Sequence, residues 1–144
     1  MVERMTDQQD TPGELDDEAL AFAHRMFDLA RAGDPQLVEF VDAGLPVNLT
    51  DPQGNTLLML SAYHGHGDLV EGLVGRGADP DRINDRGQSP LAAGVFKDAP
   101  DVITALMDAG ADPHAGSPSA IETARFFERD ELLPILARPP GPDT

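Results

Sequence analysis

The chain has 144 residues and a formal net charge of −16 at pH 7, because 26 Asp and Glu outnumber 10 Lys and Arg. This charge excludes nucleic acids and anionic membranes as expected partners, since both are bound through Lys and Arg; the absence of cysteine excludes disulfide scaffolds, thiol catalysis and thiolate zinc sites. No apolar run approaches the ~20 residues that span a bilayer, and the first residues lack a signal-peptide pattern, so we expect a monomer in the cytoplasm.

In chain order, residues 1–14 are polar and contain Thr11-Pro12-Gly13, which predicts a disordered acidic tail. A single folded domain is expected over 15–138. Its first part is a helical capping unit over 17–46, in which the acidic run from Asp16 begins one helix and Asp34-Pro35 begins a second.

Two similar segments follow at an offset of 33 residues and define repeats over 51–83 and 84–113. Such a period is typical of stacked repeat architectures, whose end units differ from the inner ones. The offset superimposes Gly54 on Gly87, Leu58 on Leu91, Leu73 on Leu106, and the four-residue run from Gly77 on the run from Gly110.

Each unit has the signals of two short helices. Thr56, Ser89 and Ser119 stand where a hydroxyl caps the first helix. Gly77 and its equivalents Gly44 and Gly110 are expected to end the second helix in a left-handed conformation. A closing unit over 117–138 begins with a capping box, in which Glu122 follows Ser119 by three residues. Residues 139–144 are predicted to be a disordered tail.

These residues resemble the ankyrin repeat. The signature residues Asp51, Gly54, Thr56, Gly65 and His66 recur in part from Asn84 onward, and both repeats end in Gly-Ala-Asp. The resemblance implies an all-α solenoid of helix-turn-helix units with protruding inter-repeat loops. It also implies that a partner protein meets the concave side, which is formed by the loop tips and the first helices.

The pattern also departs from the family. The histidine that usually follows the Thr-Pro-Leu motif is replaced by Met59, Ala92 and Glu122. Pro134 is expected one turn inside the last helix, where it would remove a hydrogen bond.

No pattern indicates catalysis. His64, His66 and Asp68 offer metal ligands within five residues. However, residues two apart on a helix point to different sides, and Gly65-His66 matches the inter-helix turn of the family. No serine lies in a nucleophile elbow and no glycine-rich loop opens a helix. We therefore expect neither enzymatic activity, a metal nor a cofactor.

The positions that the resemblance assigns to the concave side are candidate contacts to a partner. Tyr63, Phe96 and Phe126 recur at one position of successive units, which favours aromatic anchors. We expect the rings to be separate, because packed helices lie about 8–10 Å apart; alternatively, they are ordinary core residues. The candidate contacts are Thr50, Gln53, Asn55, Tyr63, His64, Ile83, Asp85, Arg86, Gln88, Phe96, Lys97 and Phe126.

Arg82, Arg86 and Lys97 form a small basic group in an acidic chain. They either neutralise Asp81 and Asp85 or offer a positive spot to a partner carboxylate. The predicted function is protein–protein recognition through the concave surface. The alternative is an acidic inhibitor or immunity-type protein that blocks a basic enzyme or a nucleic-acid-binding site.

Overall fold

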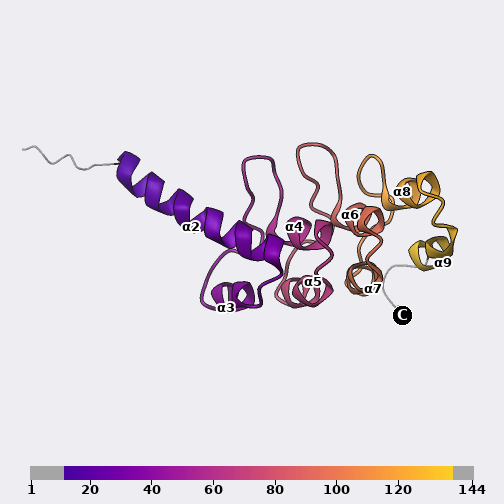
Figure 1. The fold of residues 1–144 in the computed structure, drawn as a ribbon, viewed down its shortest axis with the longest axis horizontal. Helices are drawn as coiled ribbons and strands as arrows, with labels where there is room; N and C mark the ends of the chain where they lie inside the picture. Colours follow the sequence, from indigo (N-terminus) through magenta and orange to yellow (C-terminus); the bar gives the residue numbers. More distant parts are fainter. Residues whose placement is uncertain (1–11, 138–144) are drawn as a thin grey trace, which may run out of the picture.

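The structure is a computed structural model that describes residues 12–137. Paired helices stand side by side in two rows, and long loops protrude beyond the first row (Figure 1). This architecture confirms the predicted all-α solenoid. The first helices are α2 (Pro12–Ala32), α4 (Leu57–Tyr63), α6 (Pro90–Lys97) and α8 (Ala120–Phe126), and the second are α3 (Gln36–Asp42), α5 (Gly67–Val74), α7 (Pro100–Asp108) and α9 (Leu133–Leu136), preceded by the 3-10 helix η1 (Asp130–Leu132).

The predicted helix caps are confirmed. The hydroxyl oxygens of Thr56 and Ser89 accept the backbone N–H groups of Met59 and Ala92, each at 3.0 Å. Ser119 and Glu122 form the reciprocal capping box. Gly77 closes the second helix of its unit with φ 93°, a conformation that favours glycine. Local sequence therefore sets the ends of these helices.

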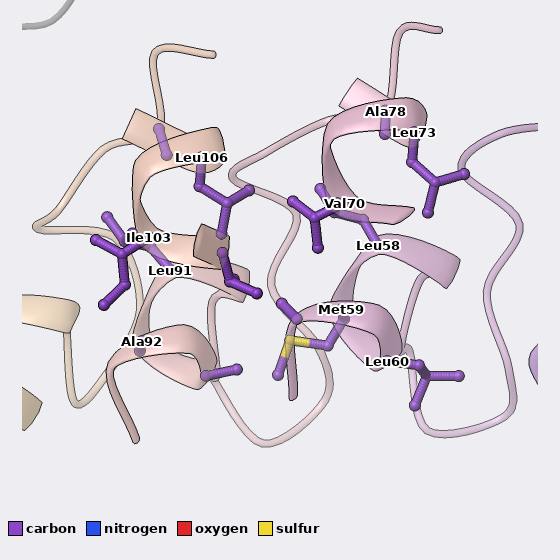
Figure 2. Packing of buried hydrophobic residues seen from close by; sticks show 14 of the residues in the cluster. Leu58, Met59, Leu60, Val70, Leu73, Ala78, Leu91, Ala92, Ile103 and Leu106 are labelled. Carbon is purple, nitrogen blue, oxygen red and sulfur yellow. The ribbon is translucent and has the colours of Figure 1, made fainter. Parts of the chain in front are cut away.

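The hydrophobic core runs along the array between the two rows (Figure 2). Leu58, Val70 and Leu73 of one hairpin and Leu91 and Ile103 of the following one are buried in the same hydrophobic cluster. Within each row the helices pack on their nearest neighbours, α4 on α6 and α5 on α7. Burying a side chain of this size contributes about 1.5–3 kcal/mol, so each hairpin depends on the next for much of its stability.

Backbone hydrogen bonds also join successive loops. The Asp85 N–H donates to the carbonyl of Gln53 at 3.0 Å, and the Ser117 N–H donates to the carbonyl of Gly87 at 2.8 Å. The guanidinium of Arg76 on one unit binds both carboxylate oxygens of Asp42 on the preceding unit. The backbone bonds hold the loops in register above the first helices, and the bonds of Arg76 join the ends of α5 and α3 in the other row.

Two ends of the array differ from the prediction. α2 begins at Pro12, inside the segment 1–14 predicted as tail, because proline is compatible with the first turn of a helix; residues 1–11 and 138–144 lie outside the described residues. Pro134 is the second residue of α9, where no helical hydrogen bond is lost, so its predicted cost was wrong. No helix within residues 12–137 is long and apolar enough to cross a membrane.

Gly94 lies where α6 approaches α7 most closely, since a Cβ placed there would lie 2.8 Å from Cγ1 of the buried Val102. We predict that Gly94→Ala destabilises the protein by about 1 kcal/mol, because overpacking of about 1–3 kcal/mol exceeds the gain in helix propensity. Urea unfolding followed by circular dichroism measures this change.

Gly75→Ala is the matched control. Gly75 is exposed and has a helical φ of −64°, and a Cβ there would meet only backbone oxygens of its own helix, the nearest that of Glu71 at 3.3 Å. Its replacement should therefore change stability less than Gly94→Ala does. In a Val102→Ala background the cost of Gly94→Ala should shrink, because the clashing methyl group is gone. An equal cost in both backgrounds contradicts the close-approach explanation.

Candidate functional site

Aromatic side chains form a continuous row across the first helices. The rings of Tyr63 and Phe96 stack with centroids 5.9 Å apart and planes inclined by 10°. Phe96 meets Phe127 edge-on at 5.6 Å. The prediction of separate anchors was therefore wrong, because side chains lean across the space between helix axes. We call Tyr63, Phe96 and Phe127 the aromatic row.

The aromatic row lies at the surface rather than in the core. Tyr63 is 42% exposed, Phe96 49% and Phe127 41%. Phe126, which occupies the predicted column, is 79% exposed and touches only the ring of Phe127 among described aromatic residues. Phe127, which the sequence places in the column next to Phe126 and which was not among the candidate contacts, takes the place in the row as the C-cap residue of α8.

An apolar hollow of about 490 Å³ opens between α6 and α8, beside the aromatic row. Its floor contains Ala92 and Ala93, at positions where the preceding unit carries Met59 and Leu60. These two small side chains leave the space that larger ones fill in the neighbouring unit. The remaining lining is provided by Tyr63, Gln88, Phe96, Pro118, Glu122, Thr123, Phe126 and Phe127.

A polar hollow of about 280 Å³ adjoins the apolar one, and Tyr63 and Gln88 line both. Arg31, His64 and Arg86 are among the residues that line the polar hollow. Its other lining residues are Asp51, Gln53, Asn55, Met59 and Leu60. The two hollows together give the first-helix side one apolar and one polar recess with a common wall.

Asn84 organises the loops around these hollows, a role that the sequence analysis did not assign. Its Nδ2 donates to Asn55 Oδ1 and Gln88 Oε1, each at 2.8 Å. Its Oδ1 accepts the N–H groups of Arg86 and Gln88. With 6% exposure, Asn84 is a buried link between consecutive loops. The signal was present, because Asp51 makes equivalent bonds one repeat earlier.

The other predicted contact residues are distributed around the same side. Thr50 forms an isolated bridge with Thr56 at the base of its loop. Ile83 is 40% exposed and lies outside both hollows, as does Asp85, whose N–H is bonded to Gln53. The structure thus gathers Gln53, Asn55, Tyr63, His64, Arg86, Gln88, Phe96 and Phe126 at the hollows and leaves Thr50, Ile83, Asp85 and Lys97 outside their linings.

The two histidines come closer than predicted. Their rings lie 6.3 Å apart and nearly parallel, because the left-handed Gly65 between them interrupts the helix. The Nε2–H of His66 donates to the carbonyl of Arg31 at 2.7 Å, which ties two units together. Within the described residues, no group of three or more His, Cys, Asp or Glu is arranged to hold a metal ion.

The basic residues do not form the single group that was considered. Arg86 lines the polar hollow, whereas the aliphatic part of Lys97 lies beside Gly65, close to His64. Arg82 lines neither hollow. No ion pair joins any of the three to a carboxylate in the part of the chain with described side chains, so neutralisation by direct pairing with Asp81 or Asp85 is not what the structure contains.

A family model described as ankyrin repeats, in three copies, matches residues 26–117. The chain belongs to the ankyrin-repeat family. The matched range includes both full ankyrin repeats and most of the capping unit, and it ends where the predicted closing unit begins. The members of this family typically act as non-catalytic modules of protein–protein interaction.

Known relatives share the repeats rather than their full length. An ankyrin repeat protein of Pseudomonas aeruginosa is 52% identical over 58 residues, 40% of this chain and 34% of that protein. Serine/threonine-protein kinase 12 of Arabidopsis thaliana is 33% identical over 120 residues, 83% of this chain and 26% of the kinase. An inactive serine/threonine-protein kinase of Mus musculus, TEX14, is 31% identical over 77 residues, 54% of this chain and 5% of that protein. The chain therefore spans about a third or less of these relatives.

We predict that Asn84→Ala lowers the free energy of unfolding by about 1–3 kcal/mol, because it leaves buried hydrogen-bonding groups of two ankyrin loops without a partner. Chemical denaturation measures the change. Asn84→Asp keeps the acceptor oxygen for the Arg86 and Gln88 N–H groups but turns a second oxygen toward Asn55 Oδ1 and Gln88 Oε1, so it should destabilise the protein as well. A stability of Asn84→Ala equal to that of the unmodified chain would refute the role of this residue.

Partial desolvation of the ring, which is exposed at the rim of the polar hollow, followed by the charges of His66, Arg31 and Lys97, lowers the pKa of His64 below its ordinary value of 6.5. NMR titration of the imidazole protons should give a midpoint below 6.5 for His64. Because the unfolded chain then binds a proton more readily than the folded one, this group makes stability decline as the pH falls from 6.5 toward the folded-state pKa. A midpoint at or above 6.5 contradicts the prediction.

Proposed function

We propose that this ankyrin-repeat protein recognises a partner protein through the side of the array that carries the loops, the aromatic row and the two hollows. The observation that supports the proposal best is the aromatic row, in which Phe96 contacts both Tyr63 and Phe127 and all three rings stay about half exposed beside an apolar recess. Exposed apolar groups of this kind are typical of interaction sites.

The surface is also held rigid before any partner binds. Asn84 and the backbone bonds between loops fix the walls of the hollows. Arg129 further secures the row, because its guanidinium donates to the carbonyls of Val95 and Phe96 and lies over the ring of Phe127. A surface that is ordered in advance loses little conformational entropy on binding, which favours affinity.

Affinity purification of the full chain from native cells, compared with variants, tests the proposal. Phe96→Ala should abolish or weaken capture of the partner, with a loss of about 2 kcal/mol or more in calorimetry with the purified partner, the size expected of an interface hot spot. Ile135→Ala is the control, because Ile135 is similarly exposed at 39% but belongs to α9 in the other row. A partner that binds both variants as tightly as the unmodified chain refutes the proposed surface.

The inhibitor alternative requires a basic partner, and only the net charge of −16 favours it. Attraction between opposite net charges accelerates association at low ionic strength and is screened by salt. A partner whose association rate constant falls steeply between low and moderate salt, with no dependence on Phe96, would favour the inhibitor function. Weak salt dependence together with the loss in Phe96→Ala would favour the recognition module.

A further inference from the structure

The polar hollow has two arginines in its lining on a strongly acidic protein. Arg31 and Arg86 line it, and the charge of Lys97 is close enough to act on His64 in the same lining. The one carboxylate of the lining, Asp51, is 9% exposed and already accepts hydrogen bonds from the N–H groups of Gln53 and Asn55 and from Asn55 Nδ2. Both of its oxygens are therefore engaged by the loop itself and neither pairs with Arg86.

Arg86 is the cation of this hollow that is best placed to meet a partner. Arg31 pairs with the neighbouring Asp28 at 2.9 Å, whereas the guanidinium of Arg86 has no protein acceptor among the residues whose side chains are described. Guanidinium groups bind carboxylates with paired N–H donors. The hollow thus offers an unused carboxylate-binding group a short distance from an apolar recess.

The common wall indicates how a polypeptide would cross from one hollow to the other. Gln88 Oε1 is engaged by Asn84, while Gln88 Nε2 has no hydrogen-bond partner in the described part of the chain, so an amide donor remains for a carbonyl group of a passing segment. Neighbouring helices lie about 8–10 Å apart and an extended chain advances about 3.3 Å per residue. Two side chains of an extended segment that fill the two hollows are therefore separated by roughly two or three residues along that segment.

We infer that the partner contributes an extended segment in which a large apolar side chain enters the apolar hollow and a single Asp or Glu, roughly two or three residues away, pairs with Arg86. This inference rests on the proposed function and adds the chemistry of the segment. A tract of several acids is not expected, because the net charge of −16 repels acidic residues that lie beyond the hollow.

Phage display of a random dodecapeptide library on the full chain tests the inference. The enriched peptides should share a Leu, Met, Phe or Trp and an Asp or Glu at the stated spacing. For a synthetic peptide from the strongest clone, fluorescence anisotropy should give an affinity about tenfold lower with Arg86→Gln. Replacing the peptide acid by its amide should cause a similar loss, and combining both changes should add little.

Two further variants separate charge from shape. Ala92→Met introduces the residue that the preceding repeat has at this place and should block the apolar side chain. Arg82→Gln removes an arginine outside both hollows and should leave the affinity unchanged. Arg86→Glu should prefer a peptide in which Lys replaces the acid. Circular dichroism of each variant checks that the fold is retained.

The results distinguish this inference from the proposed function. Peptides that lack an acid, or that bind Arg86→Gln as well as the unmodified chain, overturn the inference; if Phe96→Ala still weakens them, the proposed surface stands. Peptides unaffected by both Phe96→Ala and Ala92→Met overturn both proposals. A library that enriches no peptide also overturns the inference, because a short segment should suffice for binding. The proposed function is then tested only by the affinity of the captured partner for Phe96→Ala.

Discussion

The structure depends on the lateral packing of each helical hairpin against the next. A hairpin such as α4–α5 exposes apolar side chains on both flanks, and these are covered only when α2–α3 and α6–α7 stand beside it. This constraint requires the units to be similar in length and places equivalent residues at regular intervals along the array. The pair Tyr63–Phe96 follows from it, since rings at one position of successive units are brought within contact distance. Phe127 extends this pair into the aromatic row from one residue beyond that position. The same packing that stabilises the fold thus assembles the candidate surface.

Much of the fold was predictable because its signals are local and recur. The hydroxyls of Thr56, Ser89 and Ser119 begin helices by binding backbone N–H groups a few residues away, which depends on neighbouring residues alone. Repetition at 33 residues then identified the units without any tertiary information. The predicted ends of the array were less accurate. The dipeptide Pro12-Gly13 is compatible both with a loop and with the first turn of a helix, so the sequence alone does not tell whether the helix starts there. The structure shows that α2 begins at Pro12.

The candidate site was predictable in outline but not in detail, because its form depends on side chains of different units. The exposed column at Tyr63 and Phe96 follows from the repeat, whereas the contact between their rings depends on how far each side chain leans toward the other. Phe127 replaces Phe126 in the row because α8 ends there and its last residues leave helical geometry. The apolar hollow exists because two residues differ between the repeats: Ala92 and Ala93 stand where the preceding repeat has Met59 and Leu60. A comparison that looks for similar residues overlooks such a difference.

The small residues on α6 also have an evolutionary consequence. Ala92 and Ala93 face the hollow, while neighbouring positions of the same helix, such as Leu91 and Val95, bury the contacts between units. Ala92 and Ala93 also belong to the buried core, at 7% and 5% exposure. Mutations that enlarge residue 92 or 93 would therefore change which ligand side chain fits and the packing between hairpins together. Selection on binding and selection on folding act here on the same two residues of one short helix, so a new partner is acquired at a cost in stability that the rest of the array has to offset.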